Sequence, residues 1–477
     1  MAMAPTPAAP ELIVEPGGAV PGPESHGTSD ASGDWPSTGS AYFALFAIIL
    51  ATFLTFFDQT VFGMLGQRIK EDFQLTDEQL GLLAGPSTVV FYVLVGIPMA
   101  RLADIFPRKF VLAGGLTAIS VVMTLGGMAQ GFVQFVGSRM FLGAGGSAHA
   151  PSSYSLLADA FPPNRITRAF ALLQLGFIGG TTIGIGLGGK LVMESANWGG
   201  HSLLGLPLHG WQWLLIGEGA AGILVALLLL MVREPRRRIP AAAAATQGAA
   251  QGKGGLLTFM GLDALKAIHA RGRVFYPLFA ALALSAVETF GLAFWRVPFM
   301  IRSYGWDEGK IGMVMAPMML ASQLLGVFFG GVFIEWLAKR YKDANVRGAA
   351  ILFGLVTICA IASPLMPTGE ASLAVMAVGG VFGLAGAVPQ NAAIQRIAPN
   401  AMRGQVTAFY LFMFTFFGAM GSLVVGSVAQ RVVGNEAELW KALVLTAGTL
   451  LPIATFCMFR AIKPYREEVE RLEALGQ

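Results

Sequence analysis

Charged residues and cysteines are scarce in this sequence of 477 residues. Asp, Glu, Lys and Arg together make up only 13% of the chain, whereas 55% of its residues are hydrophobic. A water-soluble chain of this length needs more polar side chains to cover its surface. The sequence therefore predicts an integral membrane protein, with the lipid bilayer as its first partner.

The two cysteines, Cys359 and Cys457, both lie in apolar runs. This setting argues against a disulfide framework and against a thiolate metal site. The sequence also shows no cluster of metal ligands, no Ser-His-Asp set and no phosphate-binding loop. We therefore expect no cofactor, no metal and no enzymatic activity. The formal charge of +4 is attributed to basic loops beside the membrane, so no nucleic-acid partner is expected.

Apolar stretches long enough to cross the hydrocarbon core as helices occur twelve times. They cover residues 41–65, 79–103, 110–129, 131–159, 168–195, 211–232, 274–302, 309–337, 348–366, 371–394, 402–430 and 437–461. The predicted fold class is an all-α membrane protein with twelve transmembrane helices in two six-helix halves.

The composition of the remaining segments predicts the domain boundaries. We expect a disordered N-terminal tail, a six-helix bundle, a linker, a second six-helix bundle and a C-terminal tail, at residues 1–40, 41–232, 233–273, 274–461 and 462–477. Residues 256–269 of the linker are compatible either with a short amphipathic helix on the membrane surface or with a polar linker.

Basic residues are distributed unevenly between the loops. Most of the 32 lysines and arginines fall in loops on the side of both termini. The positive-inside rule therefore predicts that both termini are cytoplasmic and that the protein spans the cytoplasmic (inner) membrane.

A repeated pattern of charges relates the two halves. An acid stands at the end of the second and of the eighth span, and a basic pair follows it at the same offset. The residues are Asp104, Arg108 and Lys109 in the first half, and Glu335, Lys339 and Arg340 in the second. Such repeats are typical of transporters whose halves are related by an axis along the membrane normal. We predict that these residues form a cytoplasmic gate.

The segment GIPMARLADIFPRK resembles the signature between the second and third helices of the major facilitator superfamily. Ala100, Ile105 and Pro107 replace the usual Gly, basic residue and second Gly. Further segments, including FFDQ and GWQWLLIGEG, are similar to the spinster-like branch over most of residues 54–238. The resemblance implies a two-half transporter fold in which the first and fourth helices of each half line a central cavity.

The chain departs from this branch at two positions. The branch usually has Asp-Arg in the first helix, where this chain has Asp58 followed by Gln59. It also has a Glu seven residues after the fourth-helix Arg, where this chain has Gly146. One base and one acid are lost together, so Asp58 and Arg139 remain as opposite charges.

Asp58 and Arg139 are expected to lie at the same depth. Asp58 stands seven residues before the end of its span and Arg139 about eight residues after the start of its own. At 1.5 Å per residue, both lie roughly 10 to 12 Å below the outer surface. Because charge inside lipid is costly, we predict that the two residues face the wet cavity as a proton-coupling or substrate site. The alternative is a permanent ion pair that only locks the two helices together.

Three more ionisable residues are candidates for this site. Glu288 corresponds by repeat to Asp58, and Arg296 follows it by eight residues. His149 is a candidate replacement for the missing Glu, although a packed, hydrogen-bonded histidine is the alternative. Glu218 is expected outside the site, near the outer interface beside Trp211 and Trp213.

Glycines crowd the fifth span, in the stretch LGFIGGTTIGIGLGGK. Small residues allow helices to approach closely, so this stretch predicts a close helix interface that moves.

These features favour a secondary active transporter that moves a small organic or amphipathic solute by alternating access, coupled to protons. Aromatic residues such as Phe57, Phe290 and Trp295 favour a largely apolar substrate, and Arg139 and Arg296 would hold an anionic head. One alternative is proton-coupled uptake of an organic or aromatic acid, because GWQWLLIGEG also resembles the sixth helix of anion and cation symporters. The other is a membrane sensor that does not transport. A monomer is expected.

Overall fold

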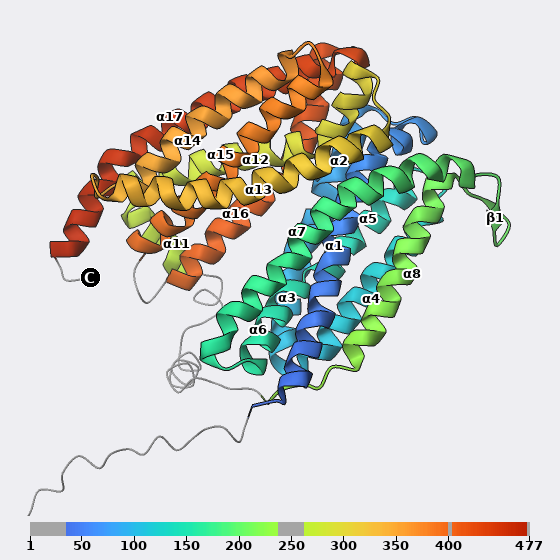
Figure 1. The fold of residues 1–477 in the computed structure, drawn as a ribbon, viewed down its shortest axis with the longest axis horizontal. Coiled ribbons are helices and arrows are strands. Elements are labelled where there is room, and N and C mark those ends of the chain that lie inside the picture. Colours follow the sequence, from blue (N-terminus) through green and yellow to red (C-terminus); the bar gives the residue numbers. More distant parts are fainter. Residues whose placement is uncertain (1–34, 237–261, 399–402, 475–477) are drawn as a thin grey trace, which may run out of the picture.

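The computed structural model describes residues 35–236, 262–398 and 403–474. In these ranges the chain is almost wholly helical, and its helices form two bundles (Figure 1). Eleven helices are long and apolar enough to cross a membrane, and a twelfth crossing consists of two shorter helices in succession. The predicted twelve-helix fold is confirmed. The predicted N-terminal tail, up to residue 34, and most of the linker lie outside the described residues.

The first half contains the helices that precede residue 231. They are α1 (Thr38–Asp72), α2 (Asp77–Ala84), α3 (Pro86–Ile105), α4 (Arg108–Gly127), α5 (Phe132–Gly146), α6 (His149–Ala160), α7 (Pro163–Ser195) and α8 (Gly210–Leu230). A 3-10 turn, Ala196–Trp198, and a small antiparallel hairpin of β1 (Ser202–Leu203) and β2 (Leu206–Pro207) connect α7 to α8.

The second half repeats this plan. Its helices are α11 (Leu262–Ala270), α12 (Gly272–Tyr304), α13 (Glu308–Ala338), α14 (Ala344–Ala362), α15 (Gly369–Ile397), α16 (Arg403–Val428) and α17 (Leu439–Ala474), with short helical turns at Ser363–Leu365, Ala429–Val433 and Glu436–Glu438. Helix α11 covers the end of the linker segment 256–269, and the residues of that segment before Leu262 lie outside the described residues. That this helix lies on the membrane surface stays a prediction. The segment from residue 462, predicted as a tail, continues α17 as a helix to Ala474.

The predicted single span 131–159 is two helices, α5 and α6, with a turn at Ser147 and Ala148 between them. Pro151 has no amide hydrogen, so it cannot donate the helical hydrogen bond to the carbonyl of Ser147. Gly145 and Gly146 before the turn weaken the helix further. The fourth crossing is therefore broken beside the candidate site.

The molecule has two different ends, which we name by their chain features. The hairpin end carries β1 and β2, and the terminal end carries the start of α1 and the end of α17. The halves meet near the hairpin end, where α2 packs on α16 and α7 on α13, and they diverge toward the terminal end (Figure 1).

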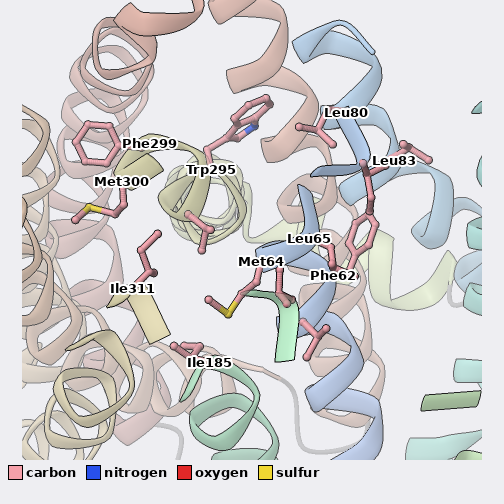
Figure 2. Close-up of a cluster of buried hydrophobic side chains, with 14 of the residues drawn as sticks. Phe62, Met64, Leu65, Leu80, Leu83, Ile185, Trp295, Phe299, Met300 and Ile311 are labelled. Carbon is pink, nitrogen blue, oxygen red and sulfur yellow. The ribbon is translucent and has the colours of Figure 1, made fainter. Parts of the chain in front are cut away.

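A cluster of buried apolar side chains fills the contact between the halves (Figure 2). Leu65 and Leu80 enter it from the first half, and Trp295 and Ile311 from the second. Each of these four side chains is fully buried. The cluster therefore keeps the two halves in contact toward the hairpin end.

Glycines of α7 and of α13 allow close contact on two sides of α7. A Cβ at Gly180 would lie 2.6 Å from the carbonyl oxygen of Phe53 on α1. A Cβ at Gly312 of α13 would lie 2.6 Å from the carbonyl oxygen of Ile185 on α7. Both distances are too short for a methyl group, so the predicted close approach is confirmed. One face of α7 therefore packs on α1 in its own half, and another face packs on α13 of the second half.

Candidate functional site

A cavity of about 360 Å³ lies between the two halves. Its charged lining residues are Asp58 of α1, Arg139 of α5 and Arg296 of α12. Aromatic and methionine side chains form much of the remaining wall, namely Phe62, Phe290, Phe294, Met64, Met315 and Met319. Trp295, which the sequence also suggested, instead packs in the core and donates to the carbonyl of Ser422 at 2.8 Å.

Asp58 and Arg139 lie together, as their depths predicted. Their closest atoms, Oδ2 and Nη1, are 3.6 Å apart, and each side chain is only 6% exposed. The guanidinium carbon also lies 3.6 Å from the centre of the Phe62 ring, at the distance of a cation-π contact. The second oxygen of Asp58, Oδ1, is buried and has no hydrogen-bond partner in the described residues. This oxygen is therefore available to a proton or a ligand.

Arg296 lacks a comparable partner. Its Nη1 lies 3.6 Å from the sulfur of Met319, and its Nε is buried without a hydrogen-bond partner in the described part of the chain. Glu288 is close enough to interact with Arg296 electrostatically, but no ion pair within 4.0 Å joins them there. A buried guanidinium with a free N–H is suited to an anionic ligand.

A second cavity, of about 470 Å³, lies mainly within the second half, and Phe177 of α7 adds to its wall from the first half. Glu288 and Arg296 are its only charged lining residues among those described. Most of the remaining wall is apolar and includes Leu352, Phe353, Val356, Met376, Phe382 and Leu384. Phe290 and Arg296 line both this cavity and the central one, so the two cavities adjoin at Arg296.

His149 lies away from these cavities. Its Nε2 is 2.9 Å from the hydroxyl of Thr52 on α1, and the residue is not among those that line the central cavity. This geometry agrees with the alternative of a packed, hydrogen-bonded histidine. A role for His149 in proton coupling stays a prediction.

Glu218 is not at an outer interface beside Trp211 and Trp213, so that expectation is wrong. Both of its carboxylate oxygens are buried, and neither has a hydrogen-bond partner in the described residues. They face a third cavity, of about 100 Å³, which Asp58 and Gly146 also line. Gly219 and Gly222 let α8 pack closely on α4, which turns this face of the helix inward.

The predicted gate residues of the first half lie at the terminal end. Arg108 is buried and donates to Glu234 at 3.0 Å and to the carboxylate of Asp159. The backbone N–H of Lys109 donates to Glu234 at 2.9 Å. All of these partners belong to the same half. The side chain of Asp104 lies outside what the structure describes.

The corresponding residues of the second half are exposed. Glu335, Lys339 and Arg340 lie at the terminal end of α13, and the guanidinium of Arg340 lies 5.0 Å from the Trp336 ring centre. In this conformation the predicted gate does not join the halves through any contact described. Its role stays a prediction for a state in which the terminal end closes.

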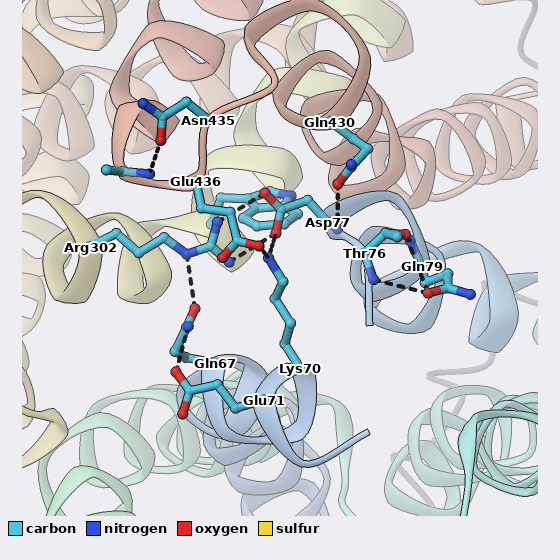
Figure 3. A network of polar contacts seen from close by, with 12 residues as sticks. Gln67, Lys70, Glu71, Thr76, Asp77, Gln79, Arg302, Gln430, Asn435 and Glu436 are labelled. Atoms are coloured by element: carbon cyan, nitrogen blue, oxygen red, sulfur yellow. Dashed lines mark hydrogen bonds and ion pairs between the residues drawn. The ribbon is translucent and has the colours of Figure 1, made fainter. Parts of the chain in front are cut away.

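A different ionic network joins the halves near the hairpin end (Figure 3). Asp77 of α2 accepts two hydrogen bonds of 2.9 Å from Arg302 of α12 and one of 2.6 Å from Lys70 of α1. Arg302 also donates to Gln67 at 2.9 Å. The side chains of Asp77 and Arg302 are only 3% and 6% exposed. Sequence reasoning missed this network.

Two further ion pairs extend the network. Arg68 of α1 pairs with Glu308 of α13 at 2.7 Å, and Arg431 pairs with Glu78 of α2 at 2.5 Å. Each connects one half to the other. Together with the apolar cluster, these pairs close the hairpin end of the central cavity.

A family model described as Major Facilitator Superfamily matches residues 48–422. This chain belongs to the major facilitator superfamily. It is 26% identical over 441 residues to an MFS-type efflux pump of Mycolicibacterium smegmatis, covering 90% of this chain and 94% of that protein. It is also 26% identical over 321 residues to the sphingosine-1-phosphate transporter SPNS2 of Danio rerio, covering 63% of this chain but only 58% of the relative.

Among solved structures, a bacterial homologue of the human lysosomal transporter Spinster, in an inward-facing and unoccupied conformation, shares the fold. The TM-score is 0.74 at 22% identity, and the match covers 91% of this chain and 98% of that one. The predicted resemblance to the spinster-like branch is therefore confirmed. The chain is a multi-pass membrane transporter of this superfamily, and its relatives are transporters rather than enzymes.

Proposed function

We propose that this protein moves an amphipathic or lipid-like organic solute with an anionic head by alternating access, coupled to protons. The observation that carries the proposal is the junction of the central cavity with the apolar cavity at Arg296. The central cavity is lined by two guanidinium groups and one carboxylate, so an anionic group there would be favoured. The apolar cavity beside it would take a hydrocarbon tail.

The apolar cavity is large enough for this task. Its volume of about 470 Å³ lies within the usual range of ligand pockets, roughly 300 to 1,000 Å³. A tail bound there would gain about 0.8 kcal/mol for each buried methylene group. The free Nε of Arg296 would then bind the head at the cavity entrance. A site of this kind selects a ligand by the length of its tail and by the charge of its head.

The contacts between the halves support an assignment of the transport state. The hairpin end is closed by the ionic network and the apolar cluster, whereas the halves diverge at the terminal end (Figure 1). If the basic loops place the terminal end in the cytoplasm of a cell with an inner membrane, this conformation faces inward. The gate of Asp104 and Glu335 would form when the terminal end closes.

Proton coupling would act first on Asp58. Protonation removes the attraction between Asp58 and Arg139 and so loosens α1 from α5. Moving a population from 1:99 to 99:1 takes about 5.5 kcal/mol, which is more than one ion pair beside a wet cavity supplies. Substrate binding or a second titrating group must therefore act with Asp58.

Two other functions compete with this proposal. An aromatic or other organic acid would fit the central cavity of about 360 Å³ without entering the apolar one. A membrane sensor would bind the same ligand but would not move it. Flux of a radiolabelled ligand into proteoliposomes separates a carrier, expected to be monomeric, from a sensor.

The test of the substrate class uses alkyl phosphates of increasing chain length, bound to the protein in nanodiscs and measured by thermal shift. Affinity is expected to rise about fourfold per methylene until the cavity is full. Gly383→Leu should shorten the optimal chain, because a Cβ at Gly383 contacts only Val356, at 4.0 Å, and so extends into the cavity. If short aromatic acids bind as tightly as long chains, the organic-acid alternative is correct.

Gly354→Leu is the matched control. Gly354 lies on α14 outside the lining of the apolar cavity, and a Cβ there meets only Thr455, at 3.9 Å. The two substitutions add the same side chain with the same minimal crowding. The chain-length optimum should therefore shift in Gly383→Leu and stay unchanged in Gly354→Leu.

A further inference from the structure

The small cavity of about 100 Å³ lies inside the first half, and Asp58 lines both this cavity and the central one. Its wall includes Glu218 of α8 and Gly146 of α5. The other polar lining residues are Gln59 and four hydroxyl-bearing side chains, namely Thr55, Thr88, Ser120 and Tyr92. Two carboxyl groups thus face one small cavity whose wall is mostly apolar.

Buried charge is not balanced in this space. Asp58 and Glu218 both interact electrostatically with Arg139, and among the described residues no other cation acts on both. Three of the four carboxylate oxygens, Asp58 Oδ1 and Glu218 Oε1 and Oε2, are buried without a hydrogen-bond partner in the described residues. A buried charge without a partner costs far more than a neutral group. One guanidinium neutralises one carboxylate, so a single proton on the pair makes the group of three neutral.

Among the described residues, the neighbouring elements offer this cavity no other ionisable group than the phenol of Tyr92. Helix α8 packs mainly on α4, with smaller contacts to α1 and α7. From α4 it meets Ser120 and Thr124, which are neutral. On α7, Lys190 and Glu194 pair with each other, and their side chains are 67% and 47% exposed. Among the described residues, Tyr92 of α3 is the remaining titratable group of the lining.

We propose that Asp58 and Glu218 share one proton as a carboxyl pair, with Arg139 as their common counter-ion, and that Glu218 is the second titrating group of transport. The transport role rests on the proton coupling proposed above; the shared proton does not. Release of this proton to water leaves two carboxylates facing one guanidinium. Uptake of a proton from the other side of the membrane restores the neutral group of three.

Position 146 offers a way to relocate the second acid. A Cβ at Gly146 meets no atom within 4 Å, and the residue lines the same cavity as Glu218. A glutamate there would place a carboxyl group in this space from α5 instead of α8. Gly146→Glu combined with Glu218→Gln should therefore restore the second carboxyl group that Glu218→Gln alone removes. A purely structural role for Glu218 in α8 packing would not be rescued in this way.

The shared proton is tested by infrared spectroscopy of the full-length protein in nanodiscs, through the carbonyl-stretch band of protonated carboxyl groups. Glu218→Gln and Asp58→Asn should each remove one equivalent from this band, because the remaining carboxylate then pairs with Arg139. Glu194→Gln is the control and should leave the band unchanged, since Glu194 is exposed and paired. If the band survives in Asp58→Asn, the two residues do not share the proton. If the band disappears when sodium replaces potassium in the buffer, a sodium ion takes the place of the proton. Either result overturns the proposal.

Transport of alkyl phosphate in proteoliposomes tests the role of this proton. Glu218→Gln should lose accumulation driven by a proton gradient while it keeps exchange of substrate at equal concentrations. Adding Gly146→Glu should restore accumulation. If the band behaves as expected but Glu218→Gln accumulates normally, Glu218 is not the second titrating group. If the wild type does not respond to a proton gradient, the proposed coupling fails, and the infrared result still decides whether the proton is shared.

Discussion

The two halves repeat one six-helix plan but treat buried charge differently. In the first half, Asp58 and Glu218 line a cavity of about 100 Å³, and Arg139 pairs with Asp58 beside it. In the second half, Glu288 and Arg296 stand at the wall of an apolar cavity of about 470 Å³. The first arrangement holds charges against one another, whereas the second leaves room for an apolar ligand. The comparison suggests that one half responds to protons and the other selects the substrate.

Helix geometry explains the difference. Asp58 and Arg139 come from two helices, α1 and α5, so their side chains can meet. Glu288 and Arg296 are eight residues apart on α12, which separates them by about 12 Å along the helix axis. Their side chains form no close pair in the described residues, and Arg296 keeps an unpartnered Nε there.

The largest expected effect is that of Arg139→Gln. Removing the cation leaves two buried carboxyl groups without their counter-ion, and breaking a buried pair in this way costs about 3 to 5 kcal/mol. We expect loss of transport and a lower melting temperature in nanodiscs. The loss of stability should shrink as the pH falls, because protonation of Asp58 and Glu218 removes the unpaired charge.

Asp58→Asn combined with Arg139→Gln is the control for this prediction. If the double variant regains stability but not transport, the pair has a function beyond holding α1 to α5. If the double variant also transports normally, Asp58 and Arg139 form only a structural ion pair.

The next largest effect is expected at the hairpin end. Asp77→Asn removes the acceptor charge that Arg302 and Lys70 share, and with it much of the network between the halves. We expect the hairpin end to open more often, with a shift in the equilibrium of about five- to 150-fold, as is usual for couplings of this kind. Distances between spin labels on α2 and α16 measure this opening.

Asp343→Asn is the matched control for Asp77→Asn. Asp343 is also buried and paired with an arginine, Arg347, but both belong to the second half. This substitution should leave the distances between the halves unchanged. If Asp77→Asn has no more effect than the control, the apolar cluster alone closes the hairpin end.

Sequence reasoning predicted the features that depend on residue spacing along a helix. It missed the features that depend on which face of a helix points inward. The twelve spans and the shared depth of Asp58 and Arg139 follow from counting residues. Glu218 was misplaced because α8 is apolar all round, so its sequence does not show which face is inside; the contact of Gly219 and Gly222 with α4 decides this. The pairing of Asp77 with Arg302 spans 225 residues, and no local pattern reveals it.

A smaller effect is expected for Arg296→Gln. Because no ion pair within the described ranges holds Arg296 in place, its loss should change stability less than the loss of Arg139. A hydrogen bond to a charged group contributes about 1.5 to 3 kcal/mol, so affinity for an alkyl phosphate should fall about tenfold to a hundredfold. Affinity for the uncharged alcohol of the same chain length should not fall. Equal losses for both ligands would show that Arg296 shapes the cavity without binding the head.

The smallest effect is expected for Glu335→Gln at the terminal end. Glu335 is exposed in this conformation, so its neutralisation should change the free energy of unfolding by less than about 0.5 kcal/mol. If Glu335 contributes to a gate that forms when the terminal end closes, its loss still favours the conformation seen here. Spin labels at the terminal ends of α3 and α13 should then show a modest increase in the population with the longer, open distance. Asp104→Asn should shift this population in the same direction. Unchanged distances in both variants would contradict the proposed gate and leave the hairpin-end network as the only ionic contact between the halves among the described residues.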